Sequence, residues 1–386
     1  MKKIIISIMA LFLFVSCTYF KVQDAIEQAN NGNYIQSLTN LSRLMANGNR
    51  SAIEAFESVY PKAEIKYADE IRANKDVDLV KYTRGLVDML KVQDIYLNLP
   101  DKNKRAMKIV TPSFEQRNEI KRELANCFYT LGERNPNYTY LEKLRTYGFF
   151  KEAQNFNVDN LKKITSKYEA AKKNATGVFY INVNDAIHNN ITSNLYSSTV
   201  LNLVKYPIFK VGTATNYNLQ FNINVSNFIY TPSTVKTETG TNSFDDTVTQ
   251  TVMKKVVETE KINGKEIQIT KWIPSYEDVK VKVYYRYIKY TKISTVSFDL
   301  GYNISEKNGT AIYSGVKNVV VSDKVQWTQY FPMTPFIGIP PVGFPISEPE
   351  KFNISREALI DKGRIQAQKE INSVIEKLYS NQNIKF

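Results

Sequence analysis

The sequence predicts an α+β fold in which a helical N-terminal domain is followed by a mainly antiparallel β-sheet and a C-terminal helix. Three observations support this prediction. Between Val22 and Lys173, apolar residues recur mostly at steps of three and four positions, as on one face of a helix. The composition changes at residues 174–177, beyond which aromatic, β-branched and polar residues alternate. Finally, Ser355 precedes a second stretch of helical spacing that continues to Tyr379.

The chain begins with the pattern of a bacterial export signal. Lys2 and Lys3 precede an apolar run from Ile4 to Val15, and a small residue, Ser16, follows. This run of about 12 residues is shorter than the ~20 residues with which a helix crosses a bilayer. The N-terminus is therefore predicted to direct export without spanning the membrane. An ordinary secretory signal with a chance cysteine after it is the alternative.

Residues Phe14–Cys17 resemble the lipobox of bacterial lipoproteins, with Phe at a position where Leu is usual. In that family the chain is cut before the cysteine, whose sulfur and new amino group receive acyl chains. The resemblance implies a signal peptide over residues 1–16 and a tether over residues 17–21, with acylated Cys17 as the membrane anchor. Thr18 stands where Asp marks inner-membrane retention in this family, which implies location at the outer membrane.

The remaining chain of about 370 residues is long enough for two domains. The first, residues 22–175, is predicted to be helical. Ser113, directly after Pro112, is a favourable helix start. The predicted helices cover Ser51–Val59, Leu79–Asn98, Ser113–Thr130, Tyr138–Tyr147 and Lys151–Lys173.

Two short segments of this domain resemble the turn of the tetratricopeptide repeat. In that motif a glycine permits the turn, an aromatic residue wedges between two helices, and a small residue allows them to approach. The segments are Gly32-x-Tyr34-x-x-Ser37 and Gly148-x-Phe150-x-x-Ala153. They lie 116 residues apart, which is not a multiple of the repeat length of about 34 residues. The resemblance implies a degenerate helical-repeat domain, and an unrelated helical bundle is the alternative.

The second domain, residues 176–330, is predicted to be mainly β. Its residues 231–247, rich in Thr, Ser and Asp, are expected to form a loop. Two Asn-Gly dipeptides mark hairpins, because Asn-Gly supplies the positive φ angles of a type I′ turn. The hairpins are Val256–Lys271, turning at Asn263-Gly264, and a second one at Asn308-Gly309. The other elements are strands at Gly177–Val183, Phe209–Val211, Asn218–Val225, Val281–Tyr287, Ile293–Ile304, Ala311–Val321 and Val325–Phe331, and a helix over Asp185–Lys205.

Residues 331–352 contain six prolines, a density that excludes a helix or a central strand. The segment is also rich in large apolar residues, and exposed apolar patches commonly bind partners. We therefore expect an interaction surface here. The alternative is that the segment lies across the sheet and packs under the C-terminal helix within residues 353–386. The candidate contact residues are Phe331, Phe336, Ile337, Ile339 and Phe344.

The sequence offers few groups for catalysis. His188 is the only histidine, which leaves too few ligands for a typical zinc site. No Gly-x-Ser-x-Gly elbow, phosphate loop or dinucleotide fingerprint occurs. With Cys17 acylated, Cys127 has no disulfide partner and is expected to be a buried core residue. We therefore predict no enzyme activity, no cofactor and no metal.

The formal net charge of +13 is spread along the chain. Residues 21–176 hold 26 Lys and Arg against 20 Asp and Glu, and the rest of the chain from Gly177 holds 23 against 18. A nucleic-acid-binding protein would concentrate this charge in a patch, so no nucleic-acid partner is expected. Tyrosines and basic residues interleave at 282–290. These are either a glycan-binding strand or tyrosines that pack on both faces of a sheet.

The order of elements from Gly177 to Leu378 resembles the core of the curli secretion lipoprotein and of the lipoproteins that activate penicillin-binding proteins. That resemblance implies an adaptor or an oligomerising export component. Our leading prediction is a non-enzymatic envelope lipoprotein that acts as an interaction or assembly module, with envelope proteins or further copies of itself as partners. The alternative is an oligomeric component of an outer-membrane export assembly. This alternative needs a membrane-facing hairpin, and the charges of the long candidate Thr247–Trp272 argue against burial in lipid.

Overall fold

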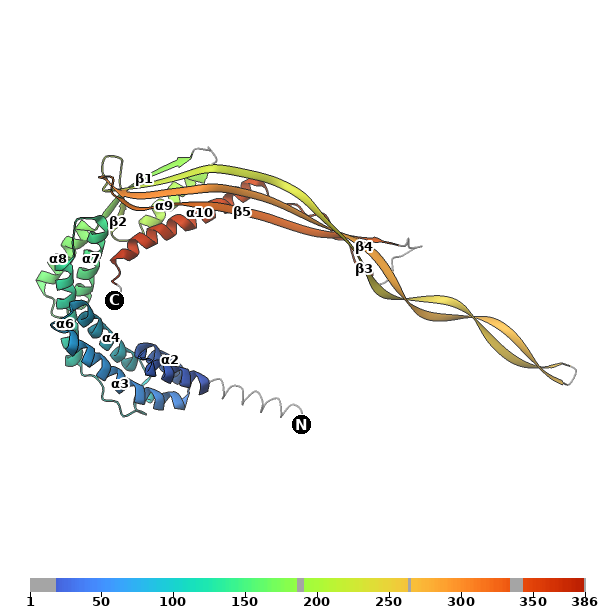
Figure 1. Ribbon diagram of the computed structural model, residues 1–386, viewed down its shortest axis with the longest axis horizontal. Helices are drawn as coiled ribbons and strands as arrows, with labels where there is room; N and C mark the ends of the chain where they lie inside the picture. Colours follow the sequence, from blue (N-terminus) through green and yellow to red (C-terminus); the bar gives the residue numbers. More distant parts are fainter. Residues whose placement is uncertain (1–18, 186–190, 263–264, 334–342, 385–386) are drawn as a thin grey trace.

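The computed structural model describes residues 19–185, 191–262, 265–333 and 343–384. A curved row of helices occupies one end of the molecule, a β-sheet lined by two helices follows, and two strands of the sheet project far beyond it (Figure 1). The predicted α+β class is confirmed. The candidate residues Cys17, His188, Phe336, Ile337 and Ile339 lie outside the described part of the chain.

The helical row starts with helical residues 19–30. Polar side chains fix several helix starts: Asp78 accepts two backbone N–H bonds at the start of α4, and Ser113 and Thr139 form capping boxes at α6 and α7. The start predicted at Ser113 is therefore confirmed. The helices are α2 (Tyr34–Ala46), α3 (Arg50–Asn74), α4 (Leu79–Leu97), α5 (Asp101–Lys104), α6 (Phe114–Arg134), α7 (Tyr140–Asn155) and α8 (Lys162–Asn174).

Helix α3 is much longer than the sequence indicated. The helix expected to end at Val59 continues through Pro61 to Asn74. A proline inside a helix removes one backbone hydrogen bond. Here Tyr60 and Ala63 flank the proline and are fully buried in a core shared with α2 and α4. Their burial offsets the lost bond, so the helix is not broken.

The row contains one of the two predicted repeat turns. Gly32, with a φ of +81°, turns the chain directly before α2, as predicted. The second segment, Gly148 to Ala153, lies inside α7, so the prediction of a turn there is wrong. The chain instead leaves the helix at residues 156–161. The helix predicted over Lys151–Lys173 is therefore divided between α7 and α8.

Helix α7 joins the helical row to the sheet. The N–H of Tyr140 donates to Glu306 Oε1 at 2.8 Å, and its hydroxyl donates to the backbone oxygen of Ala175 at 3.0 Å. Further along α7, a Cβ at Gly148 would collide with the backbone oxygen of Gln382 in the C-terminal turn η1. The glycine thus permits a close approach of the two segments. Because buried side chains of α7 also belong to the core of the sheet, the row is fixed to it.

Within the described residues, the sheet has the strand order β2-β1-β3-β4-β5. β1 lies parallel to both β2 and β3, whereas β3, β4 and β5 pair in antiparallel fashion. The mainly antiparallel sheet agrees with the sequence. The strands are β1 (Gly177–Asp185), β2 (Phe209–Val211), β3 (Leu219–Ile262), β4 (Lys265–Glu306) and β5 (Ala311–Pro332).

Helices α9 (Ile191–Leu203) and α10 (Arg356–Tyr379) cover one face of the sheet (Figure 1). Ser355 caps α10 as predicted and accepts a bond from the Ala358 N–H at 3.2 Å. Large apolar side chains fill the space between the sheet and the helices. Phe179, Phe221 and Phe298, from three different strands, are fully buried there.

The largest departure from the sequence prediction is the length of β3 and β4. The loop predicted at residues 231–247 is wrong, because this segment is a continuous part of β3 paired with residues 280–295 of β4. The predicted hairpin is confirmed by the pairing of Ile262 with Lys265, although its turn residues lie outside the described part. Register shifts after Ser226 and Thr231 bend β3 on its way out of the sheet.

Candidate functional site: the projecting ribbon

Beyond the sheet, β3 and β4 form a free-standing two-stranded structure, visible on the right of Figure 1. We call it the ribbon. It consists of residues 243–262 and 265–284, which pair in twenty successive steps. At a rise of ~3.3 Å per residue, it is about 65 Å long. The ribbon starts where β5 ends, with Pro332 paired to Tyr285.

Both long edges of the ribbon lack a strand partner in the described structure. β1 accompanies β3 only as far as Val225, and β5 accompanies β4 only from Tyr285 onward. One further bond, from the Met333 N–H to the Tyr284 oxygen, ends this contact. Unpaired backbone groups along such edges readily bind other strands, and proteins usually cover or shorten them. Along the ribbon most of them stay without a strand partner. On the β3 edge, the Thr247 N–H donates to Asp246 Oδ1 at 2.9 Å and the Ser243 N–H donates to Asn242 Oδ1 at 2.8 Å.

A proline makes the two edges unequal. Pro274 has no N–H, and β4 tolerates it because its backbone nitrogen faces away from β3. The outer edge of β4 therefore lacks a hydrogen-bond donor at this position. Met253 lies opposite Pro274. The backbone N–H and C=O groups of Met253 also face outward, because in a non-hydrogen-bonded antiparallel pair these groups of both residues point away from the partner strand. Thr249 and Thr251 share this direction through the two-residue alternation. From Thr234 to Ile262, β3 contains no proline, so its outer edge is uninterrupted.

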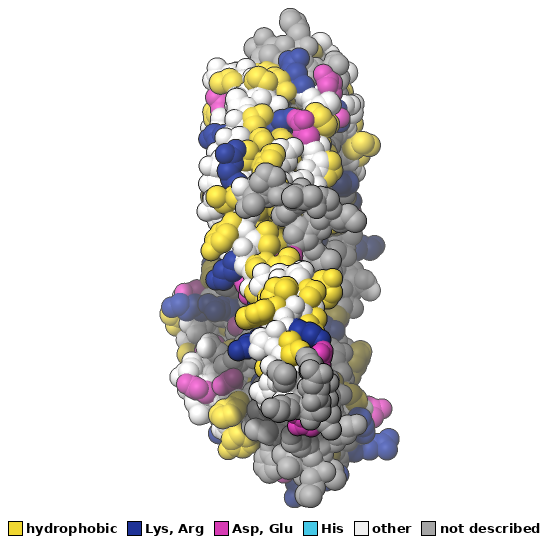
Figure 2. Space-filling view, turned by 90° about the vertical axis from the view of Figure 1, so that its right-hand side faces the viewer, with side chains coloured by type: hydrophobic (Ala, Val, Ile, Leu, Met, Phe, Trp, Pro, Cys, Tyr) yellow, Lys and Arg dark blue, Asp and Glu magenta, His cyan; other side chains and the backbone are white. Residues whose placement is uncertain are grey.

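The two faces of the ribbon differ in chemistry. The Val/Ile face carries mainly branched apolar side chains, and the Thr/Lys face carries threonines, lysines and exposed aromatic residues. On the Thr/Lys face, Trp272 is 60% exposed and Tyr276 is 76% exposed. Figure 2, which faces this end of the molecule, shows apolar side chains interspersed with both charges. The apolar members of the Val/Ile face are Phe244, Val248, Val252, Val256, Ile269, Ile273, Val279, Val281 and Val283.

Several charges on the Val/Ile face are paired within the ribbon. Lys254 lies 2.9 Å from Glu277, and Lys271 lies 2.7 Å from Glu258 and 3.0 Å from Glu260. The hydrogen bonds to these two glutamates raise the pKa of Lys271. Residues 243–284 contain seven lysines and seven acidic residues, so the ribbon is neutral within a chain of net charge +13. Two ribbons therefore have no net charge to repel each other.

Residues 343–352 of the Pro-rich segment lie against β5 near the base of the ribbon. The Glu348 N–H donates to the Thr328 oxygen at 2.9 Å, and the Tyr330 N–H donates to Ser347 Oγ at 2.8 Å. This described part of the segment packs across the sheet. Lys292 strengthens the contact by pairing with Glu350 at 2.5 Å while lying over the Trp327 ring.

Two of the predicted contact residues of the Pro-rich segment can be placed. Phe331 is 42% exposed and pairs with Arg286 at the end of β5. Phe344 is half-buried, with its ring centre 6.3 Å from that of Phe244 and 5.9 Å from that of Tyr285. Phe344 thus closes the base of the ribbon, whereas Phe331 remains accessible at its side.

The tyrosines of the predicted glycan strand lie on both faces of β4. Tyr290 stacks on Trp327 with ring centres 4.9 Å apart, and Tyr287 covers the space where Gly240 lacks a side chain. Tyr285 belongs to the aromatic cluster at the base of the ribbon. Tyr284 is the exception, with 53% of its surface exposed. This arrangement agrees with tyrosines that pack on both faces of a sheet.

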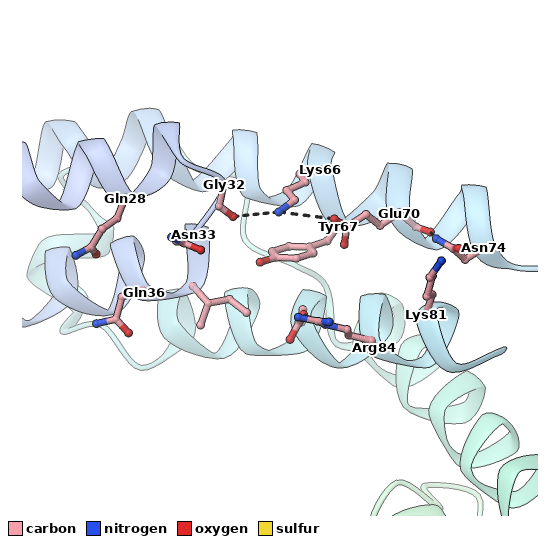
Figure 3. A pocket seen from close by; sticks show the side chains of 12 residues that line it. Gln28, Gly32, Asn33, Gln36, Lys66, Tyr67, Glu70, Asn74, Lys81 and Arg84 are labelled. Carbon is pink, nitrogen blue, oxygen red and sulfur yellow. Dashed lines mark hydrogen bonds and ion pairs between the residues drawn. The ribbon is translucent and has the colours of Figure 1, made fainter. Parts of the chain in front are cut away.

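The helical row contains a polar cleft of about 890 Å³ (Figure 3). Lys66, Lys81 and Arg84 point into it from α3 and α4. Each has a partner already: Lys66 donates to the Gly32 oxygen at 3.0 Å, Lys81 lies 3.7 Å from Asp78, and Arg84 lies 3.7 Å from Asp88. The cleft therefore offers amide and charged groups that are largely satisfied within the chain.

A second groove of about 840 Å³ lies between α3, α4 and α6. Its lining includes the apolar side chains of Ile65, Leu86 and Met89 and the carboxylates of Glu119 and Glu123. Grooves with apolar lining are common docking places for segments of other proteins.

Metal-ligating side chains do not gather in the part of the chain that the structure describes. No group of three or more His, Cys, Asp or Glu side chains lies close enough there to hold a metal ion. Cys127 is buried as predicted, and burial raises the pKa of its thiol to about 11. Among the described residues, no helix is long and apolar enough to cross a membrane.

Comparisons with known proteins return no relative. No protein-family model matches the chain, and neither a curated protein nor a solved structure is significantly similar to it.

Proposed function

We propose that the chain is a non-enzymatic assembly protein of the bacterial envelope, tethered at the outer membrane through acylated Cys17, and that the ribbon is its assembly element. The observation that carries this proposal is a ribbon of twenty residue pairs with two unpaired edges. The lipobox resemblance supports the tether, and the apolar groove of the helical row supports a second contact with envelope proteins.

The ribbon needs a partner for physical reasons. An isolated two-stranded hairpin is at best marginally stable in water, and three or more strands or a packed helix are needed for independent stability. In the sheet, β3 and β4 have α9 and α10 as cover, but the ribbon extends beyond both (Figure 1). A strand added to its edge supplies main-chain hydrogen bonds and side-chain pairs. We therefore infer that the ribbon acts by strand addition.

A second candidate function is an oligomeric component of an outer-membrane export assembly. The ion pairs on the Val/Ile face favour it, because they weaken the objection raised by the charges of Thr247–Trp272. Lys254, Glu258 and Glu260 have partners on the same face. Lys255 lies on the opposite face by the strand alternation. In this reading, ribbons from several copies would form a closed ring.

The proposal is tested by affinity capture from crosslinked cells with the lipidated full chain. The test variant lacks residues 247–280 and carries Asn-Gly at the new tip, which shortens the ribbon and leaves the sheet intact. The matched control is Cys17→Ala, which removes the anchor and keeps the ribbon. We expect envelope partners, or differently tagged copies of the chain, to be captured by the full ribbon and lost from the shortened variant. An identical set of partners for both would refute the proposal.

A further inference from the structure

The charge and apolar pattern of β3 identifies a specific partner for its open edge. This inference rests on the proposed function, because it names the strand that the ribbon adds. We propose that the partner is β3 of a second copy of this chain, paired antiparallel and centred on Gln250.

The backbone direction allows this pairing. Thr249, Thr251 and Met253 point their backbone groups toward the open edge, as derived from Pro274 on the other strand. In a pairing centred on Gln250, Thr249 of one copy faces Thr251 of the other, so both residues of the pair present outward groups. Gln250 then faces its own counterpart as a non-hydrogen-bonded pair. Two copies related by a two-fold axis meet this condition. Two-fold symmetry is also the symmetry of most dimers.

The side chains match in this register. Asp245 lies opposite Lys255 and Asp246 opposite Lys254, each pair occurring twice in a two-fold dimer. The apolar residues match as well: Val248 faces Val252, and Phe244 faces Val256. Opposite charges and apolar pairs across strands stabilise a sheet, whereas like charges oppose it.

Neighbouring registers lose this complementarity. Moving the centre by one residue places Asp246 opposite Val256 in one direction and opposite Val252 in the other. Moving it two residues toward the tip places Asp246 opposite Glu258, a like-charge pair. The register centred on Gln250 is therefore the one that the residues of β3 select.

The edge is also long enough. The pairing brings Ile262 of one copy opposite Glu238 of the other, and β1 leaves the β3 edge at Val225. The overlap thus falls within the open part of β3. Edge pairing of this kind joins two ribbons into a four-stranded sheet, which is wide enough for independent stability.

A cysteine at the centre tests the register. The Cα atoms of a non-hydrogen-bonded antiparallel pair lie about 4.5 Å apart, within the range of a disulfide. We expect Gln250→Cys, in the Cys17→Ala full chain, to form a disulfide-linked dimer under mild oxidation. The matched control is Glu277→Cys, because Glu277 lies opposite Gln250 in the same ribbon but on the interrupted β4 edge. Dimers from Glu277→Cys alone, or from neither variant, would overturn the inference.

A charge reversal gives a second readout. Asp246→Lys places lysine opposite Lys254 at both symmetric positions, and we expect the dimer dissociation constant, measured by analytical ultracentrifugation, to rise about tenfold or more. Glu169→Lys makes the same change of net charge on α8 and should leave the dimer dissociation constant unchanged. Equal effects of the two variants would overturn the inference. If ribbon deletion abolishes capture of partners but Gln250→Cys gives no dimer, the proposed function stands and this inference fails.

Discussion

The junction between the helical row and the sheet can be tested at one atom. Gly148 lies within α7, where alanine is normally preferred by about 1 kcal/mol because it loses less backbone entropy. Here, however, a Cβ would collide with the backbone oxygen of Gln382 and come within 3.2 Å of Ile384. Backbone atoms yield less readily than the end of a flexible side chain. We therefore expect Gly148→Ala to destabilise the protein, against its helix propensity.

The expected change in the free energy of unfolding for Gly148→Ala follows from two opposing effects. Overpacking of this kind costs about 1–3 kcal/mol, and the upper end applies because the collision is with the backbone. Subtracting the gain in helix propensity of about 1 kcal/mol leaves a net loss of about 2 kcal/mol. In a chain that lacks residues 380–386, the collision is absent, and the same substitution should instead stabilise by about 1 kcal/mol. The coupling between the two changes is then about 3 kcal/mol.

Urea unfolding followed by far-ultraviolet circular dichroism measures this cycle. The four proteins are the parent chain, Gly148→Ala, the truncated chain and the truncated chain with Gly148→Ala. Gly301→Ala serves as a control, because the nearest atoms to its Cβ lie 3.7 Å away and require no movement. If Gly148→Ala stabilises the full chain as much as the truncated chain, the close contact between α7 and the C-terminal turn does not exist.

Three further predictions concern single residues. Because burial raises the pKa of Cys127 to about 11, its thiol in the Cys17→Ala chain should react with Ellman's reagent at neutral pH only after denaturant is added, and rapid reaction of that folded chain would contradict the burial. Hydrogen bonds from the Asn353 side chain and the Ile354 N–H lower the pKa of Asp323, so the stability that they provide is present at neutral pH and is lost as the pH falls through the folded-state pKa. Asp323→Asn should therefore lower the urea midpoint at about pH 7, and its difference from the parent should shrink as the pH falls through the folded-state pKa of Asp323; a difference that does not change with pH would contradict this reasoning. Trp272, which is 60% exposed, should be readily quenched by acrylamide in the monomer, and a Trp272→Phe variant should remove that accessible fraction.

The sequence predicts the architecture well because most of its signals are local. The capping residues Ser113 and Ser355 predict the starts of α6 and α10, and the Asn-Gly dipeptide predicts the hairpin at the tip of the ribbon. The close contact at Gly148 could not be found in this way. Its cause is a residue more than 200 positions away, and a local match to a turn motif cannot reveal that contact.

The sequence does not predict that β3 continues unbroken through residues 231–247, because hydrophobicity reports burial. Residues 231–247 contain few apolar side chains, since both faces of this part of β3 meet solvent or lie at the edge of the sheet. Their many threonines were the available signal, because β-branched residues favour extended backbone. A Thr-rich segment between two predicted strands is therefore compatible with either a loop or one long strand. The pairing with residues 280–295 shows that it is part of one long strand.

The residues of the ribbon also help to decide between a two-fold dimer and an oligomeric export assembly. A strand that crosses a membrane needs about 9–11 residues, with apolar side chains at successive positions on the lipid side. On the Val/Ile face, the longest such run in β4 is Val279, Val281 and Val283, and β3 alternates apolar residues with Gln250, Lys254 and Glu258. Ion pairing lowers the cost of burying these charges but does not remove it.

A ring of copies must also pair the open edge of β3 with the outer edge of β4. Pro274 removes a hydrogen-bond donor near the middle of that edge. Pairing of β3 with β3 uses the uninterrupted edge twice and needs no lipid around the ribbon. The geometry therefore favours a two-fold assembly outside the bilayer. A native mass of two chains would support this dimer, whereas the mass of a larger closed oligomer would support the export assembly.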